Sequence, residues 1–286
     1  LALSFNSSSS LKIDDVKASG SYTNVPGFSN LSWQQNGSYS NNFTNTSGST
    51  FVSNCKGVSN GYSFMQLRWT NSSGKSRLRV NYVLSSEFNY DYGILYNAKT
   101  TEYTTSDIPN TNNSEASYTS SIAKSTRATS SATSISGTYD YIVSPNNVYY
   151  ILIMYRKDSS VDKNDDTFTV SFTIENYKTV NFRSNNGNIP ASTGSDWIGS
   201  GSVVTKSLTS TDTFGTLPTP TRSGYRFMGW YTSSSGGTRI SSDTVVGSVT
   251  TVYAQWETTD ITFPTDWRDS VKSIDSTSYY DLVNIS

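Results

Sequence analysis

Carboxylates are the groups that could perform acid–base chemistry in this chain, because it contains 22 Asp and Glu but no histidine and one cysteine. The absence of histidine excludes a Ser-His-Asp triad, a Cys-His dyad and any histidine-ligated metal site. A single cysteine excludes an internal disulfide and a cysteine-cluster zinc site. Enzymatic chemistry would therefore depend on Asp and Glu, as it does in glycoside hydrolases.

Three carboxylates are spaced so that folding could bring them together. Glu87 and Asp91 lie near each other at the end of an expected strand, and Asp158 follows a later strand. If the two loops pack together, these groups could form the carboxylate pair of a hydrolase. They could equally form ion pairs and hydrogen bonds with Arg156 or Lys157 that hold the loops. We expect the second arrangement, assign no catalytic residue and expect no enzymatic activity.

A calcium site is the one cofactor site that the residue spacing indicates. The run 162–166 places oxygen ligands at alternate positions, as calcium-binding loops do. It lacks the glycine at the sixth position and the glutamate at the twelfth that complete an EF-hand loop, so a solvated hairpin turn is the alternative. We predict at most a weak calcium site formed by Asp158, Asp162 and Asp166, and no other cofactor.

Composition and charge exclude several further classes of protein. Only 15% of the residues are charged and the net charge is −1, which argues against the basic surface that nucleic-acid binding needs. No apolar run approaches the roughly 20 residues of a membrane-spanning helix, so we expect no membrane insertion within this chain. Aromatic residues make up 13%, which argues against a simple disordered tract.

Alternating apolar and polar residues predict antiparallel strands in the first part of the chain, at 65–69, 78–84, 139–143 and 168–174. Segment 148–155 is apolar throughout and predicts a central strand covered on both faces. Since no convincing amphipathic helix occurs, the pattern predicts a β-sandwich or jelly roll. The Ser-, Thr- and Asn-rich stretch 99–136 predicts a long solvated loop or a pair of weak edge strands.

The second part of the chain carries the most specific motif. Residues 217–232 read Leu-Pro-Thr-Pro-Thr-Arg-Ser-Gly-Tyr-Arg-Phe-Met-Gly-Trp-Tyr-Thr, and residues 252–256 read Val-Tyr-Ala-Gln-Trp. With an earlier strand and an Asn186-Gly187 turn, this region resembles the Listeria–Bacteroides repeat, the internalin B-repeat type of module, over about 178–257. The resemblance implies a β-grasp-like fold without catalysis, used in tandem in bacterial surface proteins.

The aromatic residues of this motif are candidates for the core of a small domain without disulfides. We expect Tyr225, Phe227, Trp230, Tyr253 and Trp256 to pack inside it, and stacking on a ligand is the alternative. The chain between the Asn-Gly turn and the Pro-rich motif is longer than the family pattern.

The fold class that follows is all-β, with an antiparallel β-sandwich or jelly roll followed by a small β-grasp-like repeat domain. The domains are expected at 1–177 and 178–257. Segment 258–286, which contains Trp267 and Tyr280, would be a C-terminal tail or the start of a further module. Through segments 82–93 and 154–161, the first domain resembles jelly-roll-like domains of gut bacterial surface proteins and phages, which implies no catalytic residues.

These features predict a non-catalytic, secreted segment of a modular protein on the bacterial surface, acting in adhesion or as a stalk or spacer. One alternative is a glycan-binding accessory module, in which Trp33 and Tyr90 would stack on sugar rings. Another is a phage fibre or decoration protein, which would place the chain in a virion. The expected partners are a cell-surface glycan or protein receptor and the neighbouring modules of a larger polypeptide or assembly.

Overall fold

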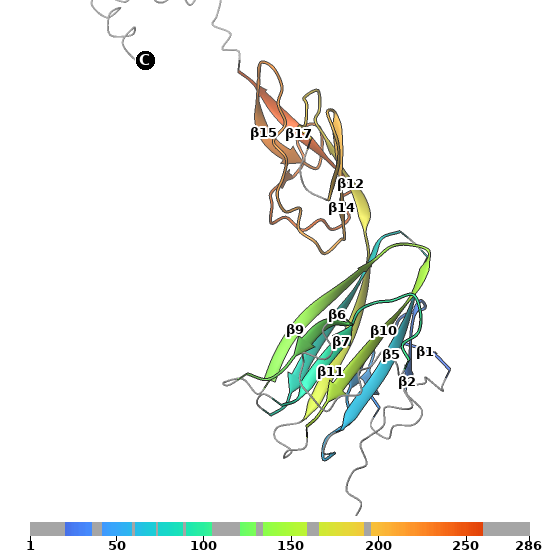
Figure 1. Cartoon of the computed structure of the whole chain (residues 1–286). Helices are drawn as coiled ribbons and strands as arrows, with labels where there is room; N and C mark the ends of the chain where they lie inside the picture. The colour runs from blue at the N-terminus through green and yellow to red at the C-terminus, as the bar shows by residue number, and fades with distance from the viewer. Residues whose placement is uncertain are drawn as a thin grey trace, which may run out of the picture. The chain divides into compact units, whose positions relative to one another are not determined.

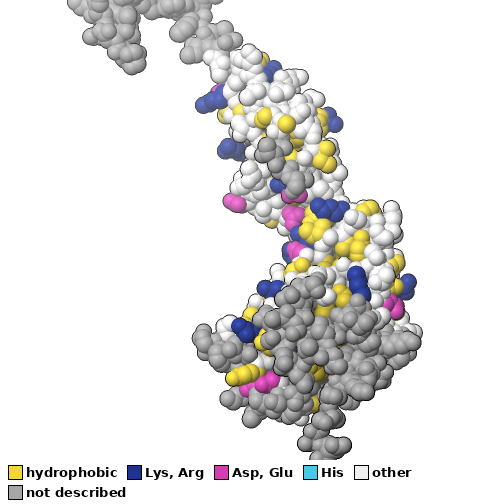
Figure 2. Space-filling model, in the orientation of Figure 1, with side chains coloured by type: hydrophobic (Ala, Val, Ile, Leu, Met, Phe, Trp, Pro, Cys, Tyr) yellow, Lys and Arg dark blue, Asp and Glu magenta, His cyan; other side chains and the backbone are white. Residues whose placement is uncertain are grey.

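The computed structural model divides into two compact units, Leu1–Tyr177 and Lys178–Ser286 (Figure 1). The elements in the described residues are all strands, which confirms the predicted all-β fold. The structure describes residues 21–35, 42–58, 61–72, 74–87, 90–104, 121–129, 134–158, 166–191 and 196–259. On the face shown in Figure 2, charged side chains are sparse and scattered among uncharged polar ones.

The first sheet of unit 1 has six strands, and each strand is antiparallel to its neighbours. Its order is β1 (Thr23–Asn24), β2 (Leu31–Gln35), β5 (Tyr62–Asn71), β10 (Asn147–Arg156), β7 (Tyr92–Tyr96) and β8 (Ile122–Thr126). The apolar run predicted as a central strand is β10, which lies between β5 and β7.

Strand β10 lacks apolar–polar alternation because both faces of its sheet are covered. Ile151, Ile153 and Tyr155 belong to the core between the two sheets. Leu152 and Met154 belong to a second apolar cluster on the opposite face of β10. The continuous apolar run is therefore the sequence pattern of a strand with two buried faces.

The second sheet of unit 1 has five strands and is also antiparallel. Its order is β3 (Thr44–Ser47), β4 (Thr50–Val52), β11 (Thr167–Asn176), β6 (Ser76–Ser85) and β9 (Ser134–Val143). Phe168, Val170 and Phe172 of β11 alternate with polar residues and enter the core, as do the alternating apolar residues of β5 and β6. The two sheets therefore form a sandwich around one core.

The polar stretch 99–136 contributes two edge strands to unit 1. Strand β8 is the last strand of the six-stranded sheet, and β9 is the last strand of the five-stranded sheet. Tyr103 is buried, and its backbone amide donates a hydrogen bond of 2.7 Å to the Gln66 side-chain carbonyl. Of the two predictions for this stretch, edge strands are therefore correct for 122–126 and 134–136. Residues 105–120 and 130–133 lie outside the described residues.

Unit 2 is a single mixed sheet. Its order is β13 (Trp197–Ser200), β14 (Val203–Leu208), β12 (Lys178–Arg183), β17 (Thr251–Thr258), β15 (Tyr225–Tyr231) and β16 (Arg239–Ile240). Strands β12 and β17 are parallel, and the other pairs are antiparallel. The stretch 189–213, expected to be longer than the family pattern, contains the β13–β14 hairpin.

The core of unit 2 contains only part of the expected aromatic set. Trp230 is fully buried, and Phe227 and Trp256 pack against the same core. The expectation was wrong for Tyr225, which is 39% exposed, and for Tyr253, which lies outside the core cluster. A bulge between Phe227 and Gly229 interrupts β15. The alternation of side chains between the two faces of the sheet therefore changes phase at this point of the strand.

Replacing Gly93 with Ala is expected to destabilise unit 1 by about 1–3 kcal/mol, since crowding a packed core forces side chains to shift. The added Cβ would lie 2.3 Å from Cε2 of Phe168, whose ring is fully buried. Chemical denaturation of Gly93→Ala, Phe168→Leu and the double variant measures the contact. The double variant should lose less than the sum of the single losses, and an additive result would contradict the proposed clash.

Candidate functional site

Three carboxylates meet at one end of the unit 1 sandwich. One oxygen from each of Glu87, Asp91 and Asp158 lies within 4.8 Å of the other two. The register that pairs Tyr92 with Arg156 brings the start of β7 beside the end of β10, which positions Asp91 and Asp158. Glu87 follows β6 of the other sheet, so the cluster joins loops from both sheets.

Asp91 is the most enclosed member of this carboxylate cluster. It is fully buried, and it accepts hydrogen bonds from the Asp158 amide at 2.9 Å and from the Tyr155 hydroxyl at 3.1 Å. Burial raises the pKa of Asp91 to about 6, and the hydrogen bond from the Asp158 amide opposes that rise. The geometry therefore holds a carboxylate in surroundings that favour its neutralisation by a proton or a cation.

A buried ion pair accompanies the cluster. The Lys157 ammonium lies 3.4 Å from the Asp166 carboxylate, and these side chains are 1% and 0% exposed. Arg156, the other cation considered from the sequence, lies with its guanidinium carbon 5.9 Å from the centre of the Tyr92 ring. The structure therefore pairs Lys157 with Asp166, a carboxylate outside the three-membered cluster.

The carboxylate cluster has the chemistry of a hard-cation site. Calcium prefers carboxylate and carbonyl oxygens, and the oxygens of Glu87, Asp91 and Asp158 are close enough to share one ion. A glycosidase pair would instead have to contact a sugar chain. Glu87 and Asp91 are only 7% and 0% exposed, so such a substrate would not reach both groups.

The predicted calcium ligands are divided by the structure. Asp158 lies in the carboxylate cluster, Asp166 pairs with Lys157, and Asp162 lies outside the described residues. The spacing of the residues had indicated 162–166 as the source of the ligands. The cluster is instead formed by Asp158 with Glu87 and Asp91. The sequence had indicated that these three come together through the packing of two loops, and not as calcium ligands.

The two candidates for sugar stacking occupy different environments. Trp33 packs against the sandwich core, with its ring centre 4.7 Å from that of Phe51 in an edge-on arrangement. Tyr90 is 57% exposed and directly precedes Asp91 in the chain. Tyr90 therefore offers an accessible ring on the loop that carries part of the carboxylate cluster.

The motif of unit 2 is held by hydrogen bonds from its two tryptophans. The Trp230 indole N–H donates to the Pro218 carbonyl at 2.8 Å, and the Trp256 indole N–H donates to the Ser184 carbonyl at 2.9 Å. Phe227 lies between them, with its ring centre 5.7 Å from that of Trp230 and 5.5 Å from that of Trp256. These contacts explain the spacing of Pro and Trp in the motif.

The Asn-Gly turn requires its glycine for a related reason. A Cβ on Gly187 would lie 2.4 Å from Cζ2 of Trp256 and 2.8 Å from the Thr221 carbonyl oxygen. The turn that follows β12 therefore packs directly under the closing tryptophan of the motif.

Comparison with known families identifies this arrangement. Residues 179–255 match the family model of the Listeria-Bacteroides repeat domain, so unit 2 contains a repeat of that family, as the motif indicated. The repeat is a surface-associated modular domain that occurs in bacterial surface proteins. No curated protein matches the chain.

Calcium is expected to raise the melting temperature of unit 1, because an ion bound by the folded carboxylate cluster stabilises the folded state. The measurement is calorimetry of the whole chain in calcium chloride and in a chelator. Asp158→Asn should abolish the shift, because it keeps the backbone amide that binds Asp91 but removes one carboxylate. Glu102→Gln, at an exposed carboxylate of the same unit, is the matched control. An equal shift for Asp158→Asn, or no shift for the unmodified chain, would contradict the site.

Proposed function

We propose that this chain is a non-catalytic segment of a modular bacterial surface protein that acts in adhesion or as a stalk or spacer. The observation that carries the proposal is the Listeria-Bacteroides repeat at 179–255, a domain type that occurs in bacterial surface proteins. The repeat follows a β-sandwich, so the chain is a series of domains of different kinds.

The packing of the two units supports a modular role. Unit 1 is built around its own apolar core, and unit 2 has a separate core that includes Phe182 and Trp230. Strand β11 ends at Asn176 and β12 begins at Lys178, so the sandwich passes into the repeat with one intervening residue. The described residues include no helix whose length and apolarity would let it cross a membrane.

We propose that unit 1 binds an external partner and that the repeat connects it to neighbouring modules. The motif aromatics of the repeat are largely used internally, because Trp230 and Trp256 bond to backbone carbonyls and Phe227 packs between them. Unit 1 presents the exposed Tyr90, and Asp158 is the partly exposed member of the nearby carboxylate cluster. Both have chemistry that could bind an external partner.

Protease treatment of intact cells tests the location. In the bacterium that makes the protein, trypsin added outside the cells should release peptides from 61–72 and 196–259, since a surface protein is accessible without lysis. Mass spectrometry of the released peptides is the measurement, and an abundant cytoplasmic protein is the control for lysis. Release only after lysis would contradict the surface role. Recovery of the same peptides from purified phage particles, and not from cells, would establish the virion alternative.

A second candidate function, glycan binding by unit 1, is favoured by one observation. Tyr90 is exposed and directly precedes Asp91, whose carboxylate lies within 4.8 Å of those of Glu87 and Asp158. An aromatic face can stack on the apolar face of a sugar, and a cation held by the carboxylates could bind sugar hydroxyls from the side of Asp158, the partly exposed member. Trp33 does not share this position, since it packs against the sandwich core.

Removing the Tyr90 ring is expected to weaken binding to a glycan array by about tenfold, the upper range for one aromatic contact. The comparison uses the unmodified chain, Tyr90→Ala and Tyr225→Ala, whose tyrosine is also exposed but lies in unit 2. A chelator should produce the same loss as Tyr90→Ala. Binding that survives both Tyr90→Ala and the chelator, or an array without any bound glycan, would eliminate this candidate.

A further inference from the structure

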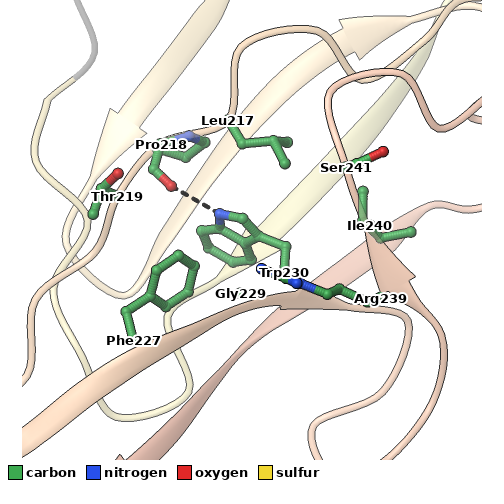
Figure 3. Close-up of a pocket in the computed structure, with 9 residues that line it drawn as sticks. All are labelled: Leu217, Pro218, Thr219, Phe227, Gly229, Trp230, Arg239, Ile240 and Ser241. Carbon is green, nitrogen blue, oxygen red and sulfur yellow. Dashed lines mark hydrogen bonds between the residues drawn. The ribbon is translucent and has the colours of Figure 1, made fainter.

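Unit 2 contains a cleft of about 420 Å³, within the size range of clefts that bind small ligands or single anchoring side chains. Figure 3 shows the side chains that surround it. Phe227, Trp230, Leu217 and Ile240 supply apolar surface. The remaining lining residues are Pro218, Thr219, Gly229, Arg239 and Ser241.

The cleft lies beside the short strand β16. Its two residues pair only with Trp230 and Tyr231 at the end of β15. After Ile240 the chain turns, with the Thr244 amide bonded to the Ser241 carbonyl at 3.2 Å. Within the described part of unit 2, no strand therefore pairs with residues 225–229 on the side of β15 that faces away from β17.

The open side of β15 offers backbone groups as well as apolar surface. The Thr259 amide donates to the Gly224 carbonyl at 3.0 Å, so residues 224 and 259 form a hydrogen-bonded pair of the β15–β17 ladder. Because the peptide groups of an antiparallel strand alternate in direction, those of Phe227 point to the other side. An open strand edge of this kind is a template for an added extended segment.

The rim of the cleft is positively charged. Gly229 has a φ of 132°, and a Cβ built on it would lie 2.9 Å from Nε of Arg239, so the arginine side chain lies close over the β15 backbone. Arg239 is exposed. The cleft therefore suits an extended segment that combines a large apolar side chain with an acidic one.

The chain itself carries a segment with this chemistry shortly after β17. Residues 260–267, which begin two residues after the end of β17, read Asp-Ile-Thr-Phe-Pro-Thr-Asp-Trp. Gly224 and Gly229 are five residues apart, or roughly 17 Å along a strand, and crossing two strand spacings adds about 10 Å sideways. Eight fully extended residues span about 26–29 Å, so Trp267 can reach the cleft.

We propose that residues 260–267 dock along the open side of β15, with the Trp267 ring in the cleft and the Asp266 carboxylate beside Arg239. The segment would extend the sheet of unit 2 by main-chain hydrogen bonds and cover the apolar lining. This inference goes beyond the proposed surface role and does not depend on it, because it concerns only contacts within unit 2.

Hydrogen exchange on the full-length chain, read by mass spectrometry, tests the docking. Peptides covering 225–230 and 260–267 should exchange about tenfold more slowly in the unmodified chain than in Trp267→Ala. Asp266→Asn and Arg239→Gln should each give a smaller loss of protection, because they remove one side of the same charge pair. Tyr280→Ala, an aromatic substitution elsewhere in the C-terminal segment, is the matched control and should leave both peptides unchanged.

Two outcomes would overturn the proposal. Equal exchange of residues 260–267 in the unmodified chain and Trp267→Ala would show that the cleft does not hold this segment. Protection that disappears on tenfold dilution would show that the occupant comes from a second copy of the chain. Protection that is independent of concentration and lost in Trp267→Ala supports docking within one molecule.

Discussion

The packing of apolar side chains into a core is the interaction on which both units depend. A chain with one cysteine cannot form an internal disulfide between its strands. The burial of apolar surface therefore has to offset the conformational entropy lost on folding. In unit 1 the Phe168 ring packs so closely against the β7 backbone that position 93 has no room for a Cβ. In unit 2 Phe182 contacts Trp230 with ring centres 5.2 Å apart. Close aromatic packing thus takes the place of covalent cross-links in both units.

The same packing explains why the buried charges at the end of the sandwich that holds the carboxylate cluster have partners. Ions are costly to bury unless they are paired, and Lys157 with Asp166 is the fully enclosed pair in this region. Asp91 relies instead on donors, the Asp158 amide and the Tyr155 hydroxyl. At this end of the sandwich, a polar network connects loops from both sheets in place of apolar packing. A binding site here would not disrupt the apolar core.

Much of the fold could be predicted from local pattern, because a period of two reports directly which face of a strand is buried. The apolar run of β10 lacks this period and predicted a strand buried on both faces, as the structure shows. The errors came from tertiary detail: Tyr225 is the first residue of β15 and lies opposite the last residue of β17, where its side chain is 39% exposed. The register of β7 and β10 decides whether the carboxylates of Glu87, Asp91 and Asp158 come close together. The unit 2 cleft lies beside the short strand β16 and is lined by residues from separate parts of the chain. Neither the geometry of the carboxylate cluster nor the cleft can be predicted from one short segment of sequence.

The parallel pairing of β12 with β17 has a mechanical consequence. These are the first and last strands of the repeat, and they lie side by side in the middle of its sheet with Asn181, Phe182 and Arg183 opposite Thr251, Val252 and Tyr253. Because both strands run in the same direction, the chain enters unit 2 at one end of this pair and leaves β17 at the other. Tension applied along the chain would therefore shear the ladder and load its hydrogen bonds together. A repeat connected in this way resists extension far better than a hairpin, whose bonds can open one at a time.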